Sequence, residues 1–128
     1  MKFLSEEWFS AMCGNLHEAF NTECDLNFTY CEVFRDCPNE AEDIWIWFDV
    51  KNGFVAGAKY GKGISPAAEL KNVGKYSAYV KVAKGELAPK MSILTGAIKL
   101  EGSKLKAFSI LGAYDKFNKA KIVPNIEF

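Results

Sequence analysis

Apolar residues recur every four positions near the start of the chain, at Trp8, Met12, Leu16 and Phe20. This spacing places them on one face of a helix, so we expect an amphipathic helix from Ser5 to about residue 21. Ser5 suits the N-cap position, because its side-chain oxygen can accept a hydrogen bond from the first turn. The chain therefore opens with a helix whose apolar face needs a partner surface.

Three stretches with strand character follow, rich in aromatic and β-branched residues: Phe28–Arg35, Ile44–Val50 and Phe54–Tyr60. Between the last two, Asn52 and Gly53 can adopt the positive backbone angles of a tight turn, which predicts a hairpin. Residues 44–48 are apolar at every position. This run predicts a central strand that is covered on both faces of its sheet.

The second half of the chain alternates short extended and helical patterns. Short strands are expected at Ala67–Lys71 and Ala97–Glu101. Helical spacing predicts a helix over residues 75–84 that ends before Gly85, and Pro89 can open a short helix to residue 95. One more amphipathic helix is expected from residue 103 onward, before a tail. No repeat or linker divides the chain, so residues 1–128 are expected to form one domain.

Charge is balanced overall but divided along the sequence. Residues 1–50 hold eleven acids and two bases, whereas residues 51–128 hold fourteen lysines and five acids. A net charge of zero argues against a nucleic-acid partner. If the halves stay apart in space, the lysine-rich half can contact an anionic membrane surface or an acidic partner; if they interleave, the charges are simply solvated. No apolar run could span a bilayer and no signal peptide is recognisable, which predicts a soluble, cytoplasmic protein.

The residues that usually carry chemistry form no recognisable site. The cysteines contain no C-x-x-C pair and fit no zinc pattern, even with the single histidine, His17, as a further ligand; they are Cys13, Cys24, Cys31 and Cys37. Buried thiols are expected, with a Cys31–Cys37 disulfide as an open alternative. The glycines of residues 57–63 lack the spacing of a P-loop and the Ser or Thr after its lysine. We therefore expect no metal and no cofactor.

The order of motifs after residue 75 has a counterpart in a known family. An aromatic residue in a helix is followed by a glycine, a proline, an apolar patch, a glycine-bounded strand and an alanine-bearing helix: Tyr79, Gly85, Pro89, Met91–Leu94, Gly96–Gly102 and Ala107-Phe108. This order resembles the C-terminal half of the sterol carrier protein 2 family. The early tryptophan Trp8 and the hairpin around Asn52 and Gly53 are similar to that family as well.

The resemblance implies an α+β fold of the order α-β(3)-crossover-β-α-β, with a five-stranded sheet covered by helices and an apolar tunnel between the layers. It also implies non-catalytic binding and intracellular transfer of a hydrophobic small molecule in that tunnel: a fatty acid, an acyl thioester or a sterol-like lipid. Packing physics alone favours a filled core, because apolar helices on an apolar sheet normally leave no cavity. The tunnel is thus an expectation from the resemblance.

The residues expected to line the tunnel come from the hairpin, the motif region and the final helix: Trp47, Phe54, Met91, Leu94, Ile98, Phe108, Leu111 and Phe117. The final helix and the tail are expected to form a lid. Lysines on and near that helix are expected to touch anionic head groups during transient contact with a membrane: Lys104, Lys106, Lys116 and Lys119.

Two functions of other classes fit the same sequence. In the first, the domain is a structural or partner-binding module with a solid core that serves an enzyme of lipid metabolism. In the second, it is an enzyme that uses Cys31 or Cys37 as a nucleophile with His17 as its base.

Overall fold

The computed structural model describes all of residues 1–128. Its elements are α1 (Glu6–Ala19), β1 (Phe28–Arg35), β2 (Ile44–Lys51), β3 (Phe54–Lys62), β4 (Leu70–Lys75), α2 (Tyr76–Ala83), α3 (Pro89–Leu94), β5 (Ile98–Gly102), α4 (Lys104–Ser109) and α5 (Leu111–Ala120). The strands form one sheet in the order β3-β2-β1-β4-β5, in which β1 pairs antiparallel with β2 and parallel with β4. The predicted α+β class with a five-stranded sheet and a crossover is confirmed.

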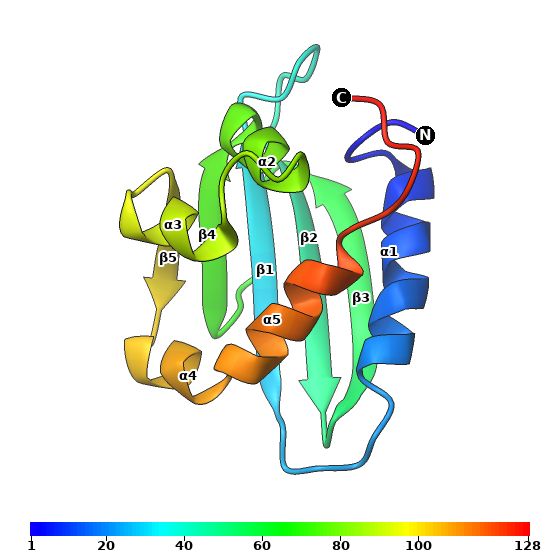
Figure 1. Cartoon of the computed structure of the whole chain (residues 1–128), viewed down its shortest axis with the longest axis vertical. Helices are drawn as coiled ribbons and strands as arrows, with labels where there is room; N and C mark the ends of the chain where they lie inside the picture. The colour runs from blue at the N-terminus through cyan, green and yellow to red at the C-terminus, as the bar shows by residue number, and fades with distance from the viewer.

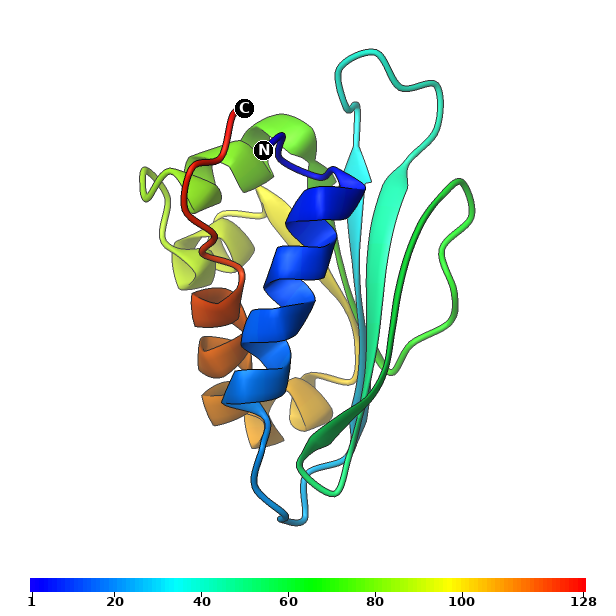
Figure 2. The ribbon, with the colours of Figure 1, turned by 90° about the vertical axis from the view of Figure 1, so that its right-hand side faces the viewer.

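The helices lie on one face of the sheet, with α1 towards β3 and with α3 and α4 towards β5 (Figure 1). The opposite face has no helix, and Figure 2 shows the connection from β3 to β4 running along it. Trp47 Nε1 donates a hydrogen bond of 3.2 Å to the Ala67 carbonyl in that connection. Ala68 packs against the small cluster on this face, so a single loop is its main cover.

β2 is an interior strand, but its two faces are covered unequally. Ile44, Ile46 and Phe48 are buried towards the helices. Trp45 and Trp47 point to the opposite face and are only half-buried. The prediction of a central strand is confirmed, but its second face is only partly covered, because a loop and no helix packs there.

The hairpin and the first helix follow the predictions closely. Asn52 and Gly53 have φ values of 51° and 87°, as a tight turn requires, and they join β2 to β3. The N-cap is confirmed, since the Ser5 side chain accepts a hydrogen bond of 3.2 Å from the Trp8 amide. The tight turn and the start of the first helix are thus determined by the residues at those positions.

Two predictions in the second half are wrong. The strand expected at Ala67–Lys71 is β4, which begins at Leu70 because the preceding alanines belong to the crossing connection. The single final helix is two helices, α4 and α5, separated at Ile110. Ile110 leaves the helical region at φ −114° and ψ 23°, and its side chain is buried. The break thus coincides with a buried side chain, and Gly112, a poor helix former, follows two residues later.

The main core lies between the sheet and the helices. Trp8, Met12 and Leu16 of α1 are buried against it, as their four-residue spacing predicts. Phe34 of β1 and Tyr79 of α2 are in ring contact with centroids 4.3 Å apart. None of the helices has the length and apolar character that a membrane span requires.

Candidate functional site

An apolar groove of about 710 Å³ opens between α2, the α2–α3 connection, α5 and the C-terminal tail. Eleven of its eighteen lining residues are hydrophobic, and they include Tyr79, Val82, Leu87, Ile122, Ile126 and Phe128. This volume lies within the range of about 300–1,000 Å³ that is usual for small-molecule sites. The groove can therefore hold an apolar ligand of moderate size.

Two residues with restricted or unusual backbone geometry shape the upper wall of the groove. Gly85 has φ 76°, a left-handed conformation that ends α2 and turns the chain. Pro89 begins α3, where its missing amide costs no hydrogen bond. The short connection between them leaves Leu87 half-buried along the groove.

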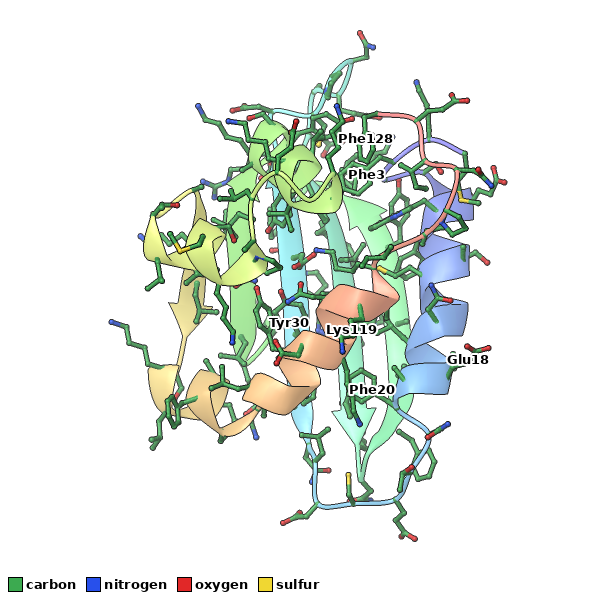
Figure 3. All side chains as sticks on the ribbon, viewed as in Figure 1. Phe3, Glu18, Phe20, Tyr30, Lys119 and Phe128 are labelled. Atoms are coloured by element: carbon green, nitrogen blue, oxygen red, sulfur yellow. The ribbon has the colours of Figure 1, made fainter.

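The C-terminal tail forms the other rim, and backbone hydrogen bonds hold it to the start of the chain. The Phe3 amide donates to the Glu127 carbonyl at 2.9 Å. The rings of Phe3 and Phe128 lie 5.2 Å apart, and Figure 3 shows these two side chains together where the tail meets the N-terminal segment. Both residues line the groove, so chain segments from opposite ends of the sequence build one wall.

A buried ion pair lies at the inner side of the groove. Lys121, a lining residue just after α5, places Nζ 2.6 Å from Oε1 of Glu32 on β1. The two side chains are 12% and 2% exposed. Lys121 Nζ also lies 5.3 Å from the ring centre of Tyr79 and 5.4 Å from that of Phe117. A charged pair thus sits directly beneath an apolar surface.

The ion pair continues into a hydrogen-bond network under the helices. Tyr30 Oη donates to Glu32 Oε2 at 2.6 Å, and Asn72 Nδ2 donates to Tyr30 Oη at 2.7 Å. Asn72 Nδ2 also lies 3.3 Å from Tyr114 Oη, while Tyr79 Oη donates to the Asn72 carbonyl at 3.1 Å. Figure 3 shows Tyr30 beside α5, from which Tyr114 reaches the network. Polar groups from β1, β4, α2 and α5 therefore meet here.

The tyrosines of the network remain neutral phenols at physiological pH. Burial raises the pKa of Tyr114 to about 12 and raises the pKa values of Tyr30 and Tyr79 well above 10, with the nearby Glu32 charge adding to each. Each hydroxyl therefore keeps its proton and can both donate and accept a hydrogen bond.

None of the eight residues expected to line a tunnel lines this groove. Trp47 lies on the helix-free face of the sheet, and Phe54 is 44% exposed at the start of β3. Ile98 and Phe117 are buried in the main core. The other four are exposed, with exposed fractions of 47%, 78%, 74% and 44%: Met91, Leu94, Phe108 and Leu111. Their contact with a lipid stays a prediction.

The space between the sheet and the helix layer on the α1 side is closed. Only a void of about 10 Å³ remains there, lined by side chains such as Leu16, Phe48 and Phe117. An acyl chain does not fit in such a void. The open apolar volume lies instead between α2, α5 and the tail.

Sequence reasoning missed the tail and the buried network. The tail carried a weak signal, since Ile122, Val123 and Ile126 are apolar but follow no helical or strand period. Glu32 carried a clear one, because it stands alone among apolar residues in the centre of β1. A charged residue at such a position must find a partner when it is buried.

The candidate thiol chemistry finds no support in the geometry. All four cysteines are free thiols; Cys31 packs in the cluster on the helix-free face, whereas Cys37 packs in the main core. The disulfide alternative for this pair is therefore wrong. Burial raises the pKa of Cys31 to about 11, which keeps it a protonated and weak nucleophile. His17 is exposed on α1, and no group of three His, Cys, Asp or Glu side chains is placed to hold a metal ion.

A comparison with models of known protein families finds no match, and neither does a comparison with curated proteins. Solved structures do resemble the chain. A crystal structure of sterol carrier protein 2 has a TM-score of 0.77 and 20% identity, covering 94% of this chain and 97% of that chain. A solution structure of a conserved hypothetical protein from Thermus thermophilus, described as possibly a sterol carrier protein, has a TM-score of 0.71 and 21% identity, with 94% and 88% covered.

A solution structure of sterol carrier protein 2 from Aedes aegypti, in complex with the C16 fatty acid palmitate, has a TM-score of 0.56 and 16% identity. It covers 91% of this chain and 98% of that chain. At these identities the similarity concerns the fold, and it spans nearly the whole of each chain. The chain has the sterol carrier protein 2 fold.

Proposed function

We propose that this protein binds a lipid non-catalytically in the groove between α2, α5 and the tail, and transfers it between membranes as a single domain of residues 1–128. The observation that carries the proposal is the groove itself, an apolar volume of about 710 Å³ with an open side. The palmitate complex of one protein with this fold supports it. The buried, protonated Cys31 and the exposed His17 argue against a thiol enzyme.

The energetics of a single acyl chain suit a carrier. Burial of about 12 methylene groups at roughly 0.8 kcal/mol each contributes about 10 kcal/mol relative to water. Costs of association and ordering of about 4–15 kcal/mol offset much of this gain. At the lower end of these costs about 6 kcal/mol remains, which corresponds to a dissociation constant of about 40 μM. Against a membrane, which is equally apolar, the free-energy difference is small, so the ligand can also leave.

A saturation experiment tests lipid binding directly. The protein is delipidated under denaturing conditions, refolded and titrated with a fluorescent fatty acid while the emission of the ligand is recorded. We expect saturable, one-site binding with a dissociation constant in the range of about 10–100 μM. A signal that rises linearly without saturation would remove the groove as a lipid site.

The side of the molecule with α3, β5 and α4 is the surface that we propose contacts a membrane. Leu94, Leu105 and Phe108 are exposed there, with exposed fractions of 78%, 82% and 74%. Lys99 and Lys104 are exposed close to them in the chain. Large apolar side chains next to lysines match the interface of an anionic bilayer, where each basic residue contributes about 1 kcal/mol.

We expect Phe108→Ser and Leu105→Ser together to lower the rate of lipid transfer to anionic vesicles by about 10-fold and to leave lipid affinity unchanged. Transfer is measured by loss of fluorescence quenching when a labelled lipid moves from protein to acceptor vesicles. Vesicles of neutral lipid serve as the control, because the parent should transfer to them more slowly. Equal transfer rates for parent and variant would exclude this surface as the docking face.

One observation favours a structural or partner-binding module as the second candidate. The helix layer on the α1 side is packed against the sheet with a void of only about 10 Å³, as in a protein without a ligand. A protein that co-purifies at constant stoichiometry, together with a negative lipid titration, would support this alternative.

A further inference from the structure

The network beneath the groove contains one buried acceptor without a donor. Asn72 on β4 is 1% exposed, and its Oδ1 has no hydrogen-bond partner. Its Nδ2, by contrast, reaches two tyrosine hydroxyls. Buried polar atoms in folded proteins almost always have partners, and exceptions often coincide with functional sites. This oxygen is therefore a candidate contact for a ligand.

The charge of Glu32 determines which atom of the Asn72 amide stays free. The Glu32 carboxylate is paired with Lys121 and can only accept hydrogen bonds. The Tyr30 hydroxyl must then donate its one hydrogen bond to the Glu32 carboxylate, 2.6 Å away. The atom of Asn72 that lies 2.7 Å from Tyr30 Oη has to bring a proton of its own, so it is Nδ2. In the opposite amide orientation Asn72 Oδ1 would face Tyr30 Oη, and both oxygens would be acceptors. The orientation with Nδ2 towards Tyr30 is therefore favoured, and in it Oδ1 is the unpaired atom.

We propose that Asn72 Oδ1 receives a hydrogen bond from the polar end of the ligand, so that the groove selects lipids ending in a donor such as an alcohol hydroxyl. This inference rests on the proposed lipid-binding function. Two residues that line the groove also touch the network: Tyr79 Oη is 3.1 Å from the Asn72 carbonyl, and Lys121 Nζ is 2.6 Å from Glu32. Asn72 is 1% exposed and does not itself line the groove, so the hydroxyl reaches it only when covering side chains such as Tyr79 and Lys121 move.

A free carboxylate cannot use this acceptor, so we expect a fatty acid to bind through its chain alone, with its head group in water. At neutral pH it has no proton to donate to Oδ1, and burying its oxygens beside that acceptor leaves both unpaired. The nearest fixed cation, Lys121, is already paired with Glu32, whose negative charge lies one tyrosine away from Asn72. An ether or ester end is neutral but also lacks the proton. Of these three kinds of polar end, only an alcohol can donate a hydrogen bond to Asn72 Oδ1, so we expect the site to favour alcohols over carboxylates and over ethers or esters.

The test compares three ligands with the same chain: dodecan-1-ol, dodecanoic acid and 1-methoxydodecane. Each displaces 1-dodecylpyrene, a probe without a polar end, from the delipidated protein. We expect the alcohol to bind at least about 10-fold more tightly than the methyl ether, because a buried acceptor that stays unpaired penalises the ether. The ratio of the two affinities is then compared between variants, so that differences in aqueous solubility cancel.

Asn72→Leu keeps the size of the side chain and removes the acceptor, and we expect it to lower the alcohol-to-ether ratio by about 5-fold or more. Tyr30→Phe provides a second variant that leaves Asn72 in place. It removes the hydroxyl that orients the amide, and it should lower the same ratio. Tyr60→Phe is the matched control, because Tyr60 donates to the backbone carbonyl of Leu4 and belongs neither to the groove lining nor to the network. Its ratio should equal that of the parent.

The outcomes separate this inference from the proposed function. A ratio that falls in Asn72→Leu or in Tyr30→Phe, and not in Tyr60→Phe, supports the hydroxyl contact. Ligands that displace the probe with the same ratio in the parent and in the folded network variants overturn the contact and leave lipid binding intact. Failure of 1-dodecylpyrene to bind the parent at all overturns both.

Discussion

Replacing Lys121 by methionine is expected to lower the free energy of unfolding by about 3–5 kcal/mol. The substitution leaves the Glu32 carboxylate, 2% exposed, without the cation that lies 2.6 Å away. Desolvation of an unpaired charge is the cause of the loss. Methionine keeps an apolar chain of similar length, so contacts with the rings of Tyr79 and Phe117 persist. Urea unfolding followed by circular dichroism measures the difference.

Two further variants identify the source of this loss. Lys119→Met changes an exposed lysine of α5 and should alter the stability by less than about 0.5 kcal/mol. The double variant Glu32→Gln/Lys121→Met removes both charges, and its glutamine can still accept from Tyr30. It should recover most of the stability. A Lys121→Met protein as stable as the parent would show that the ion pair contributes nothing to the fold.

Replacing Ala83 by tryptophan is expected to weaken binding of a fluorescent fatty acid by at least about 10-fold. Ala83 ends α2 and lines the groove with an exposed side chain, so an indole can extend into the open volume without disturbing the core. It would displace several methylene groups of a ligand, each of which contributes about 0.8 kcal/mol. Titration of the delipidated variant measures the change.

Leu94→Trp is the matched control for this blocking variant. Leu94 ends α3, is 78% exposed and does not line the groove. We expect its affinity to equal that of the parent. The reverse pattern, with binding lost in Leu94→Trp and kept in Ala83→Trp, would assign the lipid site to the tunnel wall expected from the resemblance.

Much of the fold was predictable because its signals are local. Strand β1 matches the expected range Phe28–Arg35, since a run of aromatic and β-branched residues is flanked by polar ones. The turn at Asn52 and Gly53 depends on two residues that tolerate positive φ. The end of α2 and the start of α3 follow from Gly85 and Pro89. In each case neighbouring residues are sufficient to determine the local structure.

The errors fall where tertiary contacts override local pattern. Ser109 and Gly112 flank the break at Ile110 but are only weak helix breakers, so the local pattern does not predict that the final helix splits where the Ile110 side chain is buried. The face on which Trp47 lies depends on strand register relative to the helix layer, which periodicity in an all-apolar run cannot give. Helix breaks and the face on which a strand residue lies are determined here by packing between segments that are far apart in the chain.

The groove was harder to predict than the fold because its parts are distant in sequence. Phe3 and Phe128 meet across the length of the chain, and Glu32 meets Lys121 from β1 to the end of α5. The resemblance indicated the correct fold, whereas the residues expected from the hairpin, the motif region and the final helix do not line this groove, and their contact with a lipid stays a prediction. Only Glu32, a lone charge in an apolar strand, indicated the buried network from the sequence.

The parallel pairing of β1 with β4 has a consequence for how this protein assembles. Hairpin β2–β3 closes through a tight turn, whereas Tyr30 must find Leu70 about 40 residues further along the chain. Contacts between distant segments form more slowly than local ones. We therefore expect the hairpin half to order early and the α2–α5 side, which includes the apolar groove, to order late. The same delay makes that side the first to loosen, which would let a cargo molecule in and out of an otherwise intact protein.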